Sequence, residues 1–234
     1  MKTSSLQTKR FSRPKKRLLR MFALCILSAL IFLFPACKKE TDYFSYVSEL
    51  RENILLAKTE TLSLRAYAVQ KEIPYETDGI ARETSTRAEI YLTAPSGDKT
   101  CLLSFTIADQ TYGGEMSYDN VKAEYYYSCT LDISSLSELS FDVEYGEEQV
   151  TLHAISVKTE RTLPPKTLLQ SLQKTETELF ESMTDKYGFA GEIYLRLLYE
   201  DAPYYYVGVI DRNGKITAFL LNAETGKILA KRQS

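Results

Sequence analysis

Apolar and polar residues alternate along most of the chain between residues 61 and 160. A period of two is typical of strands that bury one face and expose the other. The alternation predicts short strands near residues 62–68, 88–92, 103–107, 121–131, 139–145 and 150–157. Turn residues such as Gly113 and Gly114 separate them. We therefore predict a mainly β region over residues 61–160, folded as an antiparallel β-sandwich.

The period changes after Pro164 and Pro165. Apolar side chains then recur at helical spacing, at Leu168, Leu169, Leu172, Leu179, Phe180, Met183 and Tyr187. This spacing predicts one amphipathic helix of about six turns that ends near Gly188. Alternation returns over residues 193–199, 204–210, 216–221 and 228–230. We predict a small α+β module over residues 161–234, in which the helix covers one face of an antiparallel sheet.

Both halves resemble known architectures. The short strands of residues 61–160 have the layout of an immunoglobulin-like sandwich, although the chain contains no tryptophan. The strands at 204–210 and 216–221, followed by the turn Asn222-Ala223-Glu224-Thr225-Gly226-Lys227, resemble the end of a PepSY-type domain, which often has Asp at the position of Asn222. The PepSY resemblance implies an extracytoplasmic regulatory or inhibitory module, with no catalytic residues to carry over.

The N-terminus combines a basic run with an apolar one. Residues 1–20 hold eight Lys or Arg and no acid, and the 16 residues 21–36 are uncharged. As a helix, that apolar run would cover roughly 24 Å, short of the ~30 Å hydrocarbon core, so it fits a signal peptide. Ala36 followed by Cys37 resembles the lipobox of bacterial lipoproteins, with Phe34 where Leu is usual. This resemblance implies cleavage before Cys37 and attachment to its sulfur of a diacylglycerol, which carries acyl chains such as palmitate.

We therefore predict that residues 1–36 are a signal peptide. Residues 37–60 are then a lipid-anchored segment that leads into the first strand, on the extracytoplasmic face of the cell membrane. The alternative is an uncleaved single N-terminal membrane anchor with its basic residues in the cytoplasm. Beyond residue 20 the chain carries a net charge of −10. This balance argues against a nucleic-acid partner, because phosphate contacts need clustered Lys and Arg.

Cys101 and Cys129 are the two cysteines of the region after Cys37. Both occupy apolar positions of alternating segments, and an extracytoplasmic location permits disulfides. A Cys101–Cys129 disulfide is one expectation, provided that the two strands are neighbours or face each other. Two unlinked core thiols are the alternative.

The sequence nominates no catalytic residue. His153 is the only histidine, so a Ser-His-Asp or Cys-His arrangement would have to use it, and its place in a strand pattern favours a structural role. A zinc site needs several His or Cys ligands, and no glycine-rich phosphate loop occurs. We expect no metal and no cofactor. A carboxylate-based hydrolase is the less favoured alternative, since it rests on generic acids.

The 17 tyrosines offer another kind of site. The runs at residues 125–127 and 204–206 put rings on both faces of two predicted strands. Exposed aromatic rings stack on sugars or anchor protein partners, and we take Tyr126 and Tyr205 as a candidate aromatic binding surface. The alternative is that these tyrosines simply suit half-buried strands.

Together these features predict a bacterial, lipid-anchored, extracytoplasmic protein that is not an enzyme. Its expected role is binding or assembly at the cell envelope, with an envelope protein or a glycan as partner. The alternative function is a regulator or inhibitor of an envelope protease, acting through residues 161–234.

Overall fold

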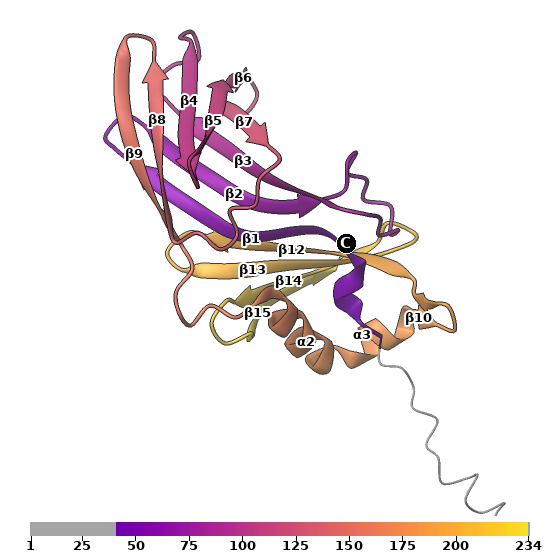
Figure 1. Ribbon diagram of the computed structural model, residues 1–234. Helices are drawn as coiled ribbons and strands as arrows, with labels where there is room; N and C mark the ends of the chain where they lie inside the picture. The colour runs from indigo at the N-terminus through magenta and orange to yellow at the C-terminus, as the bar shows by residue number, and fades with distance from the viewer. Residues whose placement is uncertain (1–40, 234) are drawn as a thin grey trace, which may run out of the picture. The chain divides into compact units, whose positions relative to one another are not determined.

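The computed structural model describes residues 41–233, and they form a mainly β structure (Figure 1). The strands are β1 Val47–Lys58, β2 Ser63–Lys71, β3 Ser85–Thr93, β4 Cys101–Ile107, β5 Gln110–Glu115, β6 Ser117–Asp119, β7 Glu124–Cys129, β8 Glu138–Tyr145, β9 Glu148–Ser156, β10 Thr184–Asp185, β11 Gly188–Phe189, β12 Gly191–Tyr199, β13 Pro203–Asp211, β14 Ile216–Asn222 and β15 Ile228–Gln233. The helices are the 3-10 helix η1 Tyr43–Tyr46 and the α-helices α2 Pro165–Thr175 and α3 Thr177–Ser182.

Strands β1 to β9 form a barrel-like antiparallel sandwich. One layer runs β1-β2-β3-β7-β6, and the other runs β9-β8-β4-β5. Inward-facing side chains of both layers fill one core, which includes Leu64, Ile90, Phe105, Phe141 and Leu152. The alternation over residues 61–160 thus predicted antiparallel strands correctly, and β5 and β6 are strands that it did not predict.

Strand β1 lies in the middle of the main sheet, although the sequence placed it in the segment leading into the first strand. Its 12 residues include Ser48, Glu49 and Leu50 as one buried run and Ile54 and Leu55 as part of another. A strand with both faces covered needs no alternation, so the period-two pattern that marks half-exposed strands is missing here.

Strands β12 to β15 form an antiparallel meander that continues the same sheet, and we call this region the extension. Strand β12 pairs in parallel with β1, so the sheet does not break between residues 161–234 and the sandwich. Helices α2 and α3 lie along one face of the extension (Figure 1). There, Leu168, Leu172 and Phe180 share a core with Leu195 and Val207.

The prediction of one long helix ending near Gly188 was wrong. The chain forms α2 and α3, which meet at Glu176, and Tyr187 is 84% exposed. The hydroxyl of Thr177 donates to the carbonyl oxygens of Gln173 and Lys174, each at 3.1 Å. Such side-chain bonds compete with the regular helical ladder. Leu172 and Leu179 are also seven positions apart, which leaves one turn without an apolar anchor.

The strand predicted over residues 121–131 is also shorter than expected. Val121 is 94% exposed, and the Asp119 carboxylate accepts hydrogen bonds from the backbone N–H groups of Val121 and Lys122. These bonds form a turn between β6 and β7, so the strand begins only at Glu124.

The predicted signal peptide, residues 1–36, and the predicted lipidation site, Cys37, lie outside the described residues. Among residues 41–233, none of the helices has the length and apolar character needed to cross a membrane.

Candidate functional site

Strand β1 has different neighbours along its two halves. Residues 47–51 pair in parallel with β12, whereas Leu55 and Leu56 pair with β9. Between the halves, the register with β2 shifts at Arg51 and Asn53, which is the signature of a β-bulge. The sheet therefore forks at this bulge, with the sandwich as one branch and the extension as the other.

Asn53 fixes the fork. This side chain is 1% exposed, and its amide donates to the carbonyl oxygens of Ile133 (3.2 Å) and Leu136 (2.8 Å). Its Oδ1 accepts from the Ser156 hydroxyl at 2.6 Å and from the Ile54 backbone N–H at 2.9 Å. A buried amide that is satisfied on both sides holds β1, β9 and the loop between β7 and β8 in one arrangement.

A groove of about 640 Å³ lies between the two branches, and we call it the fork groove. Its sandwich wall consists of Arg51, Ile54, Leu56, Arg65 and Tyr67, and its extension wall consists of Leu198, Tyr199, Glu200, Tyr204, Leu220 and Leu229. Tyr199 is 45% exposed and Leu229 is 48% exposed. The groove is thus mainly apolar and aromatic, with charged groups in few places, which is the usual character of a binding site.

Three arginines lie in or beside the fork groove, and they differ in their partners. Arg65 forms an ion pair with Glu124, and Arg196 forms one with Glu49. The Arg51 guanidinium lies 4.1 Å from the centroid of the Tyr67 ring. Within residues 41–233 no carboxylate pairs with Arg51, and its buried Nε has no hydrogen-bond partner.

The structure places Tyr205 in the core, so its assignment to an exposed aromatic surface was wrong. Tyr205 is 0% exposed, and its hydroxyl donates to the Leu163 carbonyl oxygen at 3.2 Å. Burial raises the pKa of this phenol. Tyr205 shares the parity of Val207 and Val209, which belong to the core under the helices. Its neighbour Tyr204 has the opposite parity and lines the fork groove.

Tyr126 is half-buried on the outer face of β7. Its ring centroid lies 5.0 Å from that of Tyr91, which in turn lies 5.6 Å from that of Tyr67. Tyr126 lines a small hollow of about 280 Å³ with Tyr91 and Lys122. Tyr126 and Tyr205 do not come together, because β3, β2, β1 and β12 separate their strands.

Cys101 and Cys129 are free thiols in the structure, which corresponds to the unlinked alternative. Cys101 is 1% exposed, and its thiol lies 3.6 Å from the Met116 sulfur. Burial raises the pKa of Cys101 to about 11 and also raises that of Cys129. Both thiols are therefore protonated near neutral pH and are poor nucleophiles.

The loop of residues 72–84 covers the part of the extension's helix-free face around Glu192. The buried Glu192 carboxylate accepts hydrogen bonds from the Ser48 hydroxyl (3.0 Å) and from the backbone N–H groups of Asp78 (3.2 Å) and Gly79 (2.8 Å). Gly79 has a φ of 77°, and a Cβ there would lie 2.4 Å from the Asp211 carbonyl oxygen. Leu198 and Tyr204, at the other end of the face, line the fork groove instead.

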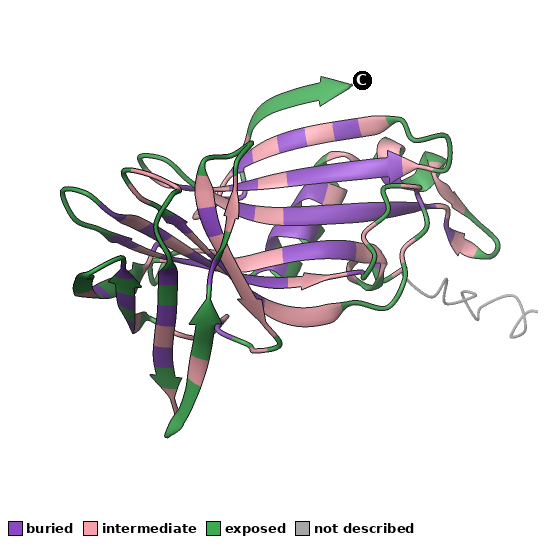
Figure 2. Cartoon of the chain, turned by 90° about the horizontal axis from the view of Figure 1, so that it is seen from above, coloured by how far each residue is buried: buried purple, intermediate pink, exposed green. Residues whose placement is uncertain are grey.

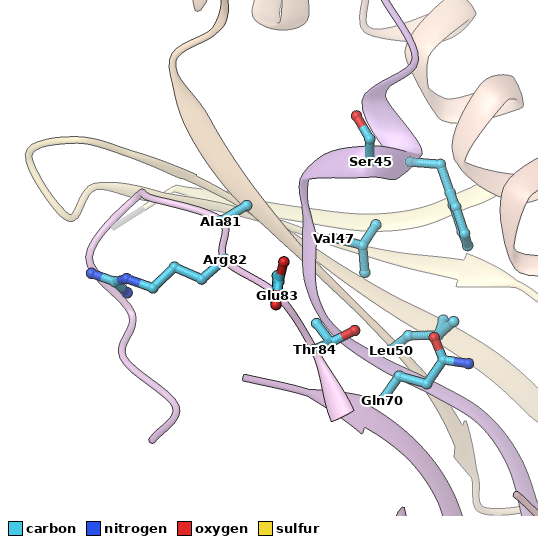
Figure 3. Close-up of a pocket in the computed structure, with 9 residues that line it drawn as sticks. Ser45, Val47, Leu50, Gln70, Ala81, Arg82, Glu83 and Thr84 are labelled. Atoms are coloured by element: carbon cyan, nitrogen blue, oxygen red, sulfur yellow. The ribbon is translucent and has the colours of Figure 1, made fainter. Parts of the chain in front are cut away.

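A second cavity, of about 570 Å³, lies beside the same loop (Figure 3). Val47, Leu50, Gln70 and Thr84 are among its lining residues. Arg82 extends away from the other labelled side chains in Figure 3 and pairs with acidic residues of the loop and of its stem, including Glu72. Because acidic residues already neutralise Arg82, this cavity attracts an anionic ligand less strongly than the fork groove does.

His153 forms a cross-strand pair with Ser140, whose hydroxyl lies 2.8 Å from His153 Nδ1. Both residues are on exposed strand surface, and neither lines the fork groove or the two cavities described above. Among residues 41–233, no carboxylate bonds to the imidazole to orient it, and no three His, Cys, Asp or Glu side chains gather as a metal site.

The chain matches no protein-family model, no curated protein and no solved structure. The candidate site therefore rests on geometry. Sequence reasoning missed Arg51, Tyr67 and Leu198, because their convergence depends on the fork. It could have found Tyr204, since Tyr205 alternates with Tyr204 and is in phase with Val207 and Val209.

Proposed function

We propose that this protein is a non-catalytic binding protein of a bacterial cell envelope. It is lipid-anchored at Cys37 on the extracytoplasmic face of the membrane and holds its partner in the fork groove. The signal-like N-terminus and the lipobox resemblance at Cys37 support the anchor, and the groove supports the binding role.

The fork groove is the observation that carries this proposal. It combines solvent-exposed apolar side chains, Tyr199 and Leu229, with an arginine that has no acidic partner among the described residues. Exposed apolar groups that converge with a few polar ones mark interaction sites. A partner in the groove would remove the apolar groups from water and neutralise Arg51.

Site-specific crosslinking in the native host tests the binding role. A photoreactive phenylalanine analogue is placed at Tyr204 and at Leu229 in the full chain, with Val121, 94% exposed, as the matched control position. We expect a discrete crosslinked product from the two groove positions and none from Val121. Equal crosslinking at all three positions, or none at the groove, would contradict the proposal.

Intact-mass analysis of protein from host membranes tests the anchor independently. The proposal expects a mature chain that starts at Cys37 and carries diacylglycerol, and Cys37→Ala should abolish this product. A chain of full length would instead favour the single N-terminal membrane anchor. That result would leave the groove crosslinking experiment interpretable.

A second candidate function is a regulator or inhibitor of an envelope protease. The helices covering one face of an antiparallel meander support it, because this is the arrangement behind the PepSY resemblance. We also propose that the sandwich is immunoglobulin-like. Assays of secreted proteases with the full chain test the regulatory role. Inhibition should be lost when exposed side chains of α2 are replaced by alanine, but it should persist in Tyr204→Ala.

A further inference from the structure

The unpaired state of Arg51 indicates the charge of the missing partner. Arg65 and Arg196 lie in or beside the same groove and each has a glutamate, whereas Arg51 has none among residues 41–233. A half-buried cation without a counter-charge has lost part of its hydration without gaining a charged partner. An anionic group of a ligand would supply this partner.

Tyr67 prepares Arg51 for such a contact. The guanidinium carbon lies over the ring, 4.1 Å from its centroid, which is within the range of a cation–π contact. Stacking uses the face of a guanidinium and leaves its N–H donors along the edge, where they fit a carboxylate in bidentate geometry. Arg51 is therefore suited to a planar carboxylate.

The walls of the groove determine what carries that carboxylate. Ile54, Leu198 and Leu220 give it an apolar floor, but Tyr199 and Leu229 remain about half exposed at its rim. An acyl chain in so open a groove would keep one flank in water. An extended peptide can turn apolar side chains inward and its polar backbone outward, so it suits this shape better.

A second charge gives the groove a direction. Arg51 is the register partner of Arg196, and Glu200 lies four residues further along the chain, in the turn after β12. At ~3.3 Å per residue, this places Glu200 roughly 13 Å from the Arg51 end, or four residues of extended chain. Glu200 would repel an acidic group at its own end and so favours the carboxylate at Arg51.

We infer that the fork groove binds an extended peptide segment of a partner protein, with an acidic side chain against Arg51 and aliphatic side chains against Leu198 and Leu220. This inference rests on the proposed binding role of the groove and specifies the class of partner.

Selection from a random heptapeptide library on the full chain in detergent tests the inference, with the Tyr204→Ala variant used to remove peptides that bind elsewhere. We expect the retained peptides to share one acidic position flanked by aliphatic residues. A selected set without acidic preference, or with no enrichment over the variant, would overturn the inference.

A thermodynamic cycle on one selected peptide tests the role of Arg51. Because charge-assisted hydrogen bonds are strong, Arg51→Gln and replacement of the peptide's acid by its amide should each weaken binding by about tenfold or more. Together they should weaken it no more than either change alone. Arg51→Lys should retain a preference for the acid, and Arg212→Gln, in an exposed turn, is the charge-matched control. Additive losses would show that Arg51 does not contact the acid.

The same protein is also titrated with dodecanoate and with a chitin oligosaccharide. If either ligand binds the wild type but not the Tyr204→Ala variant, and no peptide does so, the peptide inference fails while the proposed binding role stands. If none of the three classes binds and groove crosslinking is absent in the host, both fail.

Discussion

The sandwich and the extension are built on the same strand but bury their sheets differently. In β8 and β9 of the sandwich, exposed and buried positions mostly alternate, because only the inner face is covered. In β12, five consecutive residues are buried, and β13 has a buried run over residues 207–210. The helices cover one face there and the loop of residues 72–84 covers the other. Figure 2 shows these long buried stretches beside the exposed edge strand β15.

The difference shows how a binding site arises from incomplete coverage. Near Glu192 the helix-free face of the extension is closed by the loop, and at Leu198 and Tyr204 it is open. The change occurs close to where β1 leaves β12 after Arg51. The fork groove therefore lies where the loop no longer covers the helix-free face of the extension and the sandwich branches away from it.

Core truncation in either region should have the largest effect and tests whether the regions unfold together. Tyr205→Ala in the extension and Phe141→Ala in the sandwich, both 0% exposed, should each lower the free energy of unfolding by about 3 to 5 kcal/mol. Because one sheet joins the regions, urea unfolding followed by far-UV circular dichroism should show a single transition in both variants.

Tyr204→Ala is the control for the first variant, since the neighbouring half-buried ring should cost about 1 kcal/mol or less. Two separate transitions, with only one shifted by each substitution, would mean that the extension is an independent domain.

Removal of the Asn53 side chain should have an intermediate effect and tests what holds the fork. Asn53→Ala leaves the carbonyl oxygens of Ile133 and Leu136 and the Ser156 hydroxyl without their buried partner. Buried polar groups are left without partners, so we expect a cost of about 1 to 3 kcal/mol in urea unfolding. Asn213→Ala, in an exposed turn, should change stability by less than about 0.5 kcal/mol. A neutral Asn53→Ala would show that the bulge is set by backbone pairing alone.

The pH dependence of stability should give the smallest effect and probes the loop side of the extension. Burial, with a smaller contribution from Glu72, raises the pKa of Glu192. Between its ordinary and its raised pKa, the folded protein binds more protons than the unfolded chain, so the free energy of unfolding falls as pH rises. Glu192→Gln removes this titration, and the wild type should gain stability relative to the variant as pH falls through that window.

The measurement is urea unfolding of both proteins from about pH 4 to pH 8, a range that spans ordinary and raised carboxylate pKa values. Glu200→Gln, at an exposed carboxylate, serves as the control substitution. A difference between wild type and Glu192→Gln that does not change with pH would exclude a raised pKa.

Local pattern and tertiary contact contributed differently to the candidate site. The alternation through Val207 and Val209 already distinguishes the inward Tyr205 from the outward Tyr204, so this part of the site was available from sequence. Arg51 was not, because nothing near it in the chain reveals that Arg65 and Arg196 have glutamate partners whereas Arg51 has none within residues 41–233.

The sequence by itself determined the antiparallel strands of the sandwich, the hairpins of the extension and the helical region before them. Each of these depends on the side chains of one segment, whose period is fixed by backbone geometry. Only the tertiary structure decided that β1 joins β12 and that the sheet forks at Asn53. Ser48 and Glu192, which bond across the β1–β12 pair, are 144 positions apart. Pairing at that distance depends on which surfaces the whole chain can bury together, and this information is not contained in any local period.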